Sequence, residues 1–138
     1  MKRVHIHLQV DDLQTSIRFY QALFAGLPDV IKQDYAKWLV HDPALNFTIS
    51  TTKGREGQQG ISHVGLQFDD GPDLEAVHTR LREASVESLP QPNAQCCYAL
   101  SDKYWLNDPD QVRWELFHTH GESAVYGETA EPAAPCCG

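Results

Sequence analysis

The chain has 138 residues, of which 41% are hydrophobic and 22% charged, and its formal net charge at pH 7 is -8. This length predicts one compact domain. An acidic chain without a basic stripe argues against nucleic-acid binding, because Lys and Arg supply most of that affinity. No apolar run approaches the roughly 20 residues of a membrane helix, and the start lacks a signal-peptide pattern. We therefore expect a cytoplasmic protein whose partners are small molecules or metals.

The first half of the chain predicts a β-α-β-β-β order. Apolar and polar residues alternate from Val4 to Val10, as in a half-buried strand. Asp12 can cap the next segment, which repeats apolar residues at helical spacing as far as Gly26. Shorter strands are expected near 29–33, 36–41 and 46–51.

The same order is predicted again after a polar, glycine-rich linker at 53–60. The segment "HIHLQVDD" (5–12) recurs as "HVGLQFDD" (63–70), and each copy precedes a helical pattern. Further strands are expected near 86–89, 97–102 and 112–118, with the repeated strand at 61–69 and a helix through Leu74, Val77 and Leu81.

The predicted fold class is therefore α+β, with two tandem βαβββ modules at about 1–52 and 61–118. Together they form a single domain over residues 1–120. The remaining segment, 121–138, has low complexity, ends in Cys-Cys-Gly and is expected to be a flexible tail.

Three polar residues are expected on one face of the sheet. Successive strand residues point to opposite faces, so the apolar positions should meet the helices and leave His5, His63 and Glu115 on the other surface. Two imidazoles and a carboxylate suit a divalent metal with open coordination positions, such as Fe(II), Zn or Mn. His7 points the same way as His5 and competes with it as a ligand.

The four cysteines come as two adjacent pairs, Cys96-Cys97 and Cys136-Cys137. Neighbouring Cα atoms lie about 3.8 Å apart, below the roughly 4.4 Å at which bridges begin, so a bond within a pair would be strained. A reducing cytosol disfavours bridges between the pairs, and we expect free thiols or metal ligands. Cys96 and Cys97 border a predicted strand, where they could bind a soft ion such as As(III), Cd(II) or Cu(I).

Several of these features together resemble the vicinal oxygen chelate superfamily of glyoxalases, extradiol dioxygenases and fosfomycin-resistance proteins. They are the repeated order, "HIHLQVDDLQTSIRFYQALF", the His of "SHVGL" and the Glu of "RWELF". The resemblance covers 3–118 and implies a cupped mixed sheet, a homodimer, and one metal held by His5, His63 and Glu115. Within the superfamily, "CCYALSDKYW" is similar to the motif of organoarsenical carbon-arsenic lyases and cadmium-induced proteins.

This closer resemblance implies a non-haem iron, dioxygenase-type lyase that takes part in arsenic detoxification. Fe(II) and O2 would cleave the carbon-arsenic bond of a trivalent organoarsenical held by Cys96 and Cys97, releasing arsenite. A His stands where some relatives carry Gln as first ligand, so Zn, Ni or Mn in the purified protein stays open. Lys103 and Tyr104 are candidates for closing the loop or favouring thiolate, with a plain surface role as the alternative.

The sequence also allows other functions. One is a cadmium- or arsenite-binding resistance protein without catalysis, against which Glu115 argues. Another is a glyoxalase-like isomerase or lyase, for which the thiols would be incidental. Cys136 and Cys137 could capture a metalloid and pass it inward, or could be unstructured. The aromatic candidates for the pocket lining are Tyr35, Trp38 and Phe47.

Overall fold

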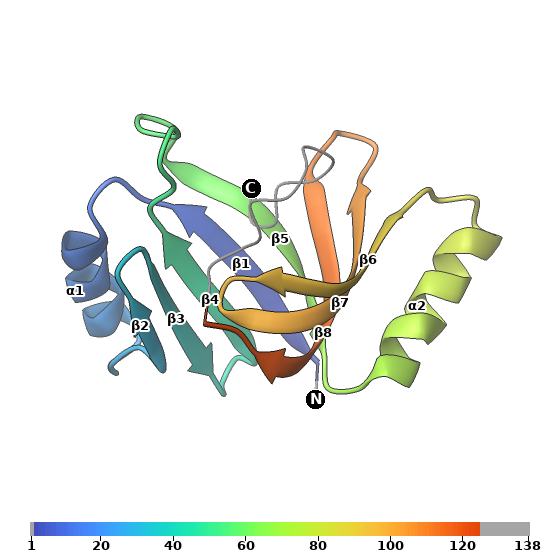
Figure 1. Cartoon of the computed structure of the whole chain (residues 1–138), viewed down its shortest axis with the longest axis horizontal. Helices are drawn as coiled ribbons and strands as arrows, with labels where there is room; N and C mark the ends of the chain where they lie inside the picture. Colours follow the sequence, from blue (N-terminus) through green and yellow to red (C-terminus); the bar gives the residue numbers. More distant parts are fainter. Residues whose placement is uncertain (1, 125–138) are drawn as a thin grey trace.

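The computed structural model describes residues 2–124, which form an eight-stranded sheet and two helices (Figure 1). The elements in chain order are β1 (Arg3–Gln9), α1 (Leu13–Leu23), β2 (Val30–Lys32), β3 (Tyr35–Val40), β4 (Leu45–Ser50), β5 (Gly60–Phe68), α2 (Gly71–Glu83), β6 (Leu89–Cys96), β7 (Ala99–Asn107) and β8 (Arg113–Glu122).

The strand order β2-β3-β4-β1-β5-β8-β7-β6 joins two equivalent halves into one mixed sheet. In each half the first strand pairs in parallel with the last, β1 with β4 and β5 with β8. β1 and β5 pair antiparallel at the centre of the sheet. The predicted α+β fold, a cupped mixed sheet built from a repeated βαβββ order, is confirmed.

The aspartates of the internal repeat are helix caps. The Asp12 carboxylate accepts a hydrogen bond of 2.6 Å from the backbone N–H of Thr15 at the start of α1. Asp70 does the same at α2, accepting from the N–H of Asp73 at 2.8 Å. Such caps satisfy N–H groups that have no partner inside the helix, so the repeat marks the start of both helices.

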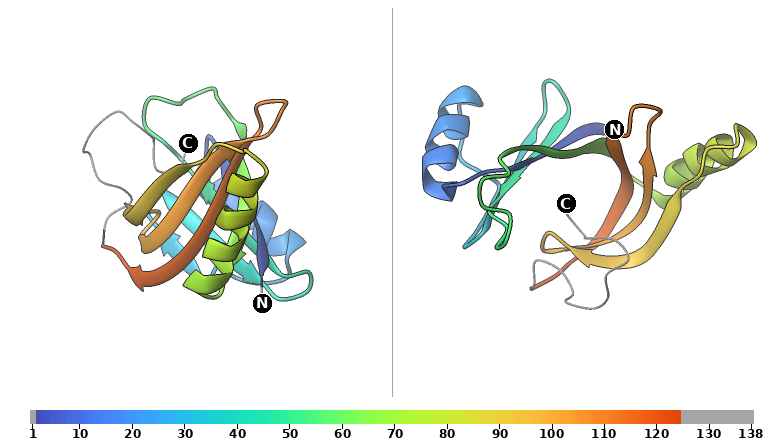
Figure 2. Two further views of the ribbon diagram at one scale, coloured as in Figure 1. Left: turned by 90° about the vertical axis from the view of Figure 1, so that its right-hand side faces the viewer. Right: turned by 90° about the horizontal axis from the view of Figure 1, so that it is seen from above.

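Each helix covers its own half of the sheet with an apolar core. The core below α1 contains the buried residues Leu13, Ile17, Ala36, Trp38, Phe47 and Ile49. The core below α2 contains Phe68, Leu74 and Leu116. Both helices lie on the convex side of the curled sheet (Figure 2), which leaves the concave side for the polar residues.

The polar face of the sheet is more deeply buried than we expected. His5 and His7 of β1 are 5% and 1% exposed, whereas Val4 on the opposite face is 50% exposed. The predicted alternation is right, but its polar side is not an open surface. Curling of the sheet encloses that side (Figure 2), so the histidines lie inside a cup.

The hairpin that carries the first cysteine pair differs from its prediction. β6 runs over Leu89–Cys96 and contains Pro90 and Pro92, which argue against a central strand. It is an edge strand, where a residue without an N–H is tolerated. β7 begins at Ala99 instead of residue 97, because the residues before it form the turn.

Candidate metal and thiol site

Three central strands bring His5, His63 and Glu115 together inside the cup. His5 lies on β1, His63 on β5 and Glu115 on β8. Their Nε2 and Oε2 atoms are mutually close: 3.2 Å between the two imidazoles, 3.3 Å from His5 to Glu115 and 3.0 Å from His63 to Glu115. All three residues are at most 5% exposed. The three residues expected on one face thus form one buried cluster.

Gly65 allows Glu115 to approach the two imidazoles. It lies directly opposite Glu115 in the parallel pairing of β5 with β8. A Cβ atom at Gly65 would lie 2.1 Å from the backbone oxygen of Glu115, far inside any permitted contact. Glycine is therefore required for the close approach of these backbones.

The two imidazoles are held so that their Nε2 atoms face the carboxylate. Nδ1 of His5 lies 3.1 Å from the backbone oxygen of Asn46, which can only accept a hydrogen bond. A neutral His5 therefore presents a lone pair at Nε2, pointing toward an oxygen of Glu115. Nδ1 of His63 is held at 3.1 Å by the hydroxyl of Ser62. Such outer contacts orient metal-ligating histidines.

The cluster fits a divalent metal ion. Donors about 2.1 Å from a metal lie about 3.0 to 3.4 Å from one another in adjacent positions, and the three separations fall in that range. The lone pair of His5 and the carboxylate oxygen that it faces would repel each other, and a cation between them would remove this repulsion. Two histidines and one carboxylate leave positions open, as in non-haem Fe(II) oxygenases.

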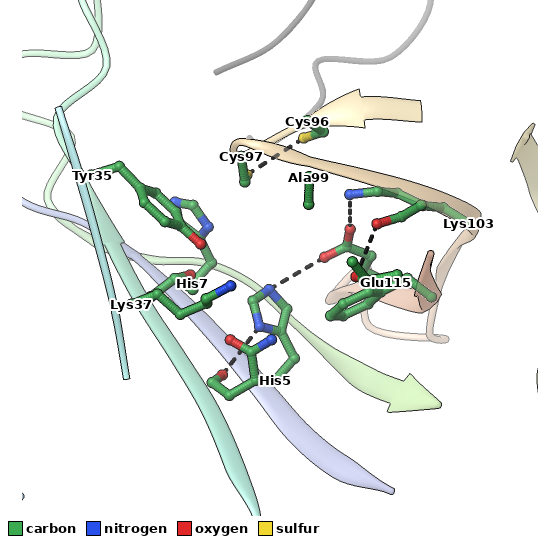
Figure 3. A pocket seen from close by; sticks show the side chains of 14 residues that line it. His5, His7, Tyr35, Lys37, Cys96, Cys97, Ala99, Lys103 and Glu115 are labelled. Carbon is green, nitrogen blue, oxygen red and sulfur yellow. Dashed lines mark hydrogen bonds and ion pairs between the residues drawn. The ribbon is translucent and has the colours of Figure 1, made fainter. Parts of the chain in front are cut away.

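A buried lysine holds the other oxygen of Glu115. Nζ of Lys103, 5% exposed, lies 2.5 Å from Oε1 of Glu115 (Figure 3). This ion pair leaves Oε2 turned toward the imidazoles. Lys103 thus contacts the carboxylate of the cluster, a contact that sequence spacing did not suggest.

Burial and charge act in opposite directions on the cluster. Burial would raise the pKa of the Glu115 carboxyl, but the charge of Lys103, followed by the nearby imidazoles, holds that pKa well below its usual value. Burial lowers the pKa of His63, against the opposing effect of Glu115. Both directions favour a carboxylate beside a neutral imidazole, the forms that bind metal.

His7 adds a third imidazole to the cup. One ligand atom each from His5, His7 and His63 lies within 4.8 Å of the others, and these three could also hold a metal. Nε2 of His7 is bonded to the hydroxyl of Ser50 at 2.7 Å. Burial, followed by the neighbouring imidazoles, lowers the pKa of His7 well below its usual value. His7 therefore lies close to the cluster, but its Nε2 is bonded to Ser50.

Cys96 and Cys97 lie at the tip of the β6–β7 hairpin, across the cup from the cluster (Figure 3). Cys97 and Tyr98 have φ of 53° and 62°, as the two central residues of a type I′ hairpin turn require. Glycine or asparagine usually fills such positions. Strained non-glycine residues of this kind concentrate at functional sites.

The oxidation state of the pair differs from our expectation. Cys96 and Cys97 are both disulfide-bonded, and no cysteine of residues 2–124 is free. Their sulfur atoms lie 3.5 Å apart, too far for a bond to each other. The expected absence of a bridge within the pair is confirmed, but the expected free thiols are not found in this state. Cys136 and Cys137 lie outside the described residues.

One hydrogen bond ties the cysteine hairpin to the first module. The Tyr98 hydroxyl donates to Asp34, between β2 and β3, at 2.5 Å, across 64 residues of sequence. The ring of Tyr98 also lies 5.7 Å from that of Tyr35 and 5.3 Å from the ammonium of Lys32. Sequence reasoning missed this contact because nothing local in "QDYAKW" pairs it with the hairpin.

Both sites line one small cavity. About 40 Å³ in volume, it is bordered by residues that include His5, Glu115, Cys96 and Cys97. A second cavity of about 240 Å³ shares Cys97 and Ala99 with it, so the hairpin borders both cavities.

Two expectations about individual side chains turn out differently. Of the aromatic candidates for the lining, Tyr35 borders the cavity, whereas Trp38 and Phe47 belong to the core below α1. Tyr104 lies on the α2 side of β7, bonded to Glu75 and stacked on His78 at 3.9 Å. It packs against the core of the second module, away from the cysteines.

The comparison with known families agrees with the fold. The sequence profile of the Glyoxalase/Bleomycin resistance protein/Dioxygenase superfamily matches residues 2–116. The chain belongs to this superfamily. It is 37% identical to a trivalent organoarsenical cleaving enzyme of Bacillus sp. (strain MD1), covering 99% of this chain and 91% of that protein. It is 31% identical to the cadmium-induced protein CadI of Mycobacterium tuberculosis (strain ATCC 25618 / H37Rv), covering 99% and 93%.

Two solved structures have the same fold as this chain at low sequence identity. Methylmalonyl-CoA epimerase from Mycobacterium tuberculosis matches with a TM-score of 0.65 at 19% identity, over 84% of this chain and 86% of that one. The Mn(II)-bound glyoxalase from Novosphingobium aromaticivorans matches with a TM-score of 0.61 at 14% identity, over 94% and 44%. Neither helix within residues 2–124 has the length and apolar character needed to cross a membrane.

Proposed function

We propose that this protein cleaves the carbon-arsenic bond of trivalent organoarsenicals and releases arsenite, using Fe(II) and O2. One observation carries the proposal: the cysteine pair borders the same cavity as His5 and Glu115, two members of the His/His/Glu cluster. Two relatives support the choice of substrate: one named as a trivalent organoarsenical cleaving enzyme, 37% identical, and one named as a probable enzyme of this kind, 35% identical, each over nearly the whole chain.

The metal ligands in this proposal are His5, His63 and Glu115. When bound, Fe(II) supplies open coordination positions and the redox chemistry that O2 requires. Asn46 and Ser62 orient the two imidazoles. Zn, Ni or Mn would fit the same donors, so the purified protein can carry another metal.

The cysteine pair is the substrate clamp in its reduced, dithiol form. Each thiol displaces one hydroxyl group from arsenic: two As–S bonds form, two As–O bonds break, and two water molecules leave. Sulfur atoms 3.5 Å apart can both reach one acceptor at about 2.3 Å, a usual thiolate–metal distance. Clamping holds the organic arm beside the cluster and replaces a bimolecular encounter with a positioned one.

The size of the cavity favours a small organic arm. A space of about 40 Å³ separates the thiols from the cluster, whereas an engineered cavity that binds benzene measures about 150 Å³. We expect methylarsenite to be turned over at least about tenfold more efficiently than phenylarsenite, which corresponds to about 1.4 kcal/mol in the transition state. Equal kcat/KM values for the two would contradict this size limit.

The test is anaerobic reconstitution with Fe(II), addition of reductant and methylarsenite, admission of O2, and measurement of arsenite. Cys96→Ser and Cys97→Ser should abolish turnover and arsenical binding while Fe(II) still binds. His63→Ala should lose Fe(II) while the thiols still bind the arsenical. No arsenite from the reduced, Fe(II)-loaded protein would refute the proposal. Tight Cd(II) or arsenite binding without turnover would support a sequestering protein instead.

Deleting residues 132–138 provides the matched control for the thiols. The deletion removes Cys136 and Cys137 and leaves the hairpin pair intact. We propose that this pair captures the metalloid and passes it inward, so the deletion should slow turnover only at low arsenical concentration. Unchanged turnover at every concentration would remove that role.

We also propose a cytoplasmic homodimer. Large apolar side chains of α1 and the following loop are exposed, namely Phe19 at 62%, Leu23 at 61% and Leu27 at 72%. Clustered exposed apolar residues are typical of protein interfaces. This supports association of two copies.

A further inference from the structure

His7 is a buried group that the proposed chemistry does not use. It is 1% exposed and borders the cavity that His5 and Glu115 also line. The internal repeat has Gly65 at the equivalent position, so this imidazole is a feature of the first module alone.

One nitrogen of His7 lacks a hydrogen-bond partner among the described residues. Nε2 is fixed by the Ser50 hydroxyl at 2.7 Å. Nδ1 is buried with nothing to donate to or accept from. Leaving a buried polar atom unsatisfied costs free energy, and such an atom in a native protein calls for an explanation.

The position of His7 beside the cluster explains the unsatisfied Nδ1. Its ring centre lies 4.9 Å from that of His63 and 6.3 Å from that of His5, and its ligand atom lies within 4.8 Å of theirs. No hydrogen bond between residues 2–124 joins it to either imidazole or to Glu115. It therefore stands beside the cluster as an outer neighbour, within reach of a small molecule bound at an adjacent open position.

We propose that His7, through Nδ1, hydrogen-bonds the small exogenous ligand at an open position of the metal held by His5, His63 and Glu115. The ligand class is a small oxygen or nitrogen donor such as O2, water, hydroxide or azide. This inference rests on the proposed metal site, but not on the arsenical substrate.

The Ser50 hydroxyl makes both directions of this hydrogen bond available. If Ser50 accepts from Nε2–H, Nδ1 carries a lone pair and accepts from bound water. If Ser50 donates to Nε2, Nδ1 carries the hydrogen and donates to a bound anion. A neutral imidazole can make the hydrogen bond in either direction, and Ser50 fixes the orientation of the ring.

The experiment uses Co(II) in the full-length protein and azide as the probe, with both affinities read from the visible d–d bands. His7→Leu should weaken azide binding about 10- to 100-fold, the value of a hydrogen bond to a charged group. Co(II) affinity should stay within about threefold, since His7 is not a ligand in this scheme. His7→Gln should restore part of the azide affinity. His41→Leu, which removes an exposed imidazole of a turn, should change neither.

Three results would overturn the inference. Azide affinity in His7→Leu within about twofold of wild type means that His7 makes no such bond. A loss of Co(II) affinity of tenfold or more, as in loss of a ligand, means that His7 coordinates the metal itself. Wild-type protein that binds no Co(II) removes the metal site as well. If His7→Leu does not fold, Ser50→Ala is used instead. This variant keeps the imidazole but removes the hydrogen bond that orients it. Unchanged azide binding in Ser50→Ala would then count against the proposal.

Discussion

Gly65 gives the sharpest prediction about how the fold builds the proposed metal site. In Gly65→Ala the new Cβ would lie 2.1 Å from the backbone oxygen of Glu115 and 3.0 Å from its carbonyl carbon. Both obstacles are backbone atoms of a paired strand, so no side chain can rotate away. β5 and β8 would have to separate by about 1 Å to reach the shortest contacts seen between packed atoms.

That separation acts on both stability and metal binding. Overpacking usually costs about 1 to 3 kcal/mol, and we expect the upper end because backbone must move. The distance of 3.0 Å between His63 and Glu115 spans these same two strands. A shift near 1 Å there should weaken Co(II) binding about 10- to 100-fold, comparable to disrupting the contacts that orient ligands.

The assay is a Co(II) titration in parallel with urea unfolding of the metal-free protein. Gly71→Ala is the matched control, because a Cβ there meets no atom within 4 Å and the residue begins α2. It should leave Co(II) binding unchanged and keep or slightly raise stability. A Gly65→Ala protein with the stability and Co(II) affinity of wild type would refute the argument that this close approach builds the site.

Three further predictions concern contacts around the cup. Lys103→Met should lower the free energy of unfolding of the metal-free protein by about 3 to 5 kcal/mol, because it leaves the Glu115 carboxylate buried and unpaired; urea unfolding measures this, and Lys103→Arg should recover part of the loss. Tyr98→Phe should weaken binding of methylarsenite to the reduced protein about tenfold, by releasing the hairpin from Asp34, while Co(II) titration shows an unchanged metal site. Burial and the hydrogen bond to Glu75 raise the pKa of Tyr104 to about 12. The resulting stabilisation is present below the ordinary tyrosine pKa and is lost as pH rises toward 12, and an ultraviolet absorbance titration of Glu75→Gln should show a lower value.

Local pattern was enough to predict the architecture. Alternating apolar and polar residues and the repeated "LQ-DD" pattern predict that each half begins with a strand followed by a helix. The second aspartate of each copy, Asp12 or Asp70, is the cap of that helix. These features depend on neighbours within a few residues, where side-chain direction follows from period alone. The same alternation placed His5, His63 and Glu115 on one face.

The sequence by itself therefore determined the modules, the polar face and the identity of the clustered side chains. Tertiary structure alone decided that this face closes into a cup, that Lys103 pairs with Glu115, and that Tyr98 reaches Asp34. The last contact joins residues 64 positions apart. Such pairings depend on how strands align and how far the sheet curls, which no local spacing encodes. Depth of burial follows from the same curvature, and it turns two polar strand residues, His5 and His7, into interior groups of the cup.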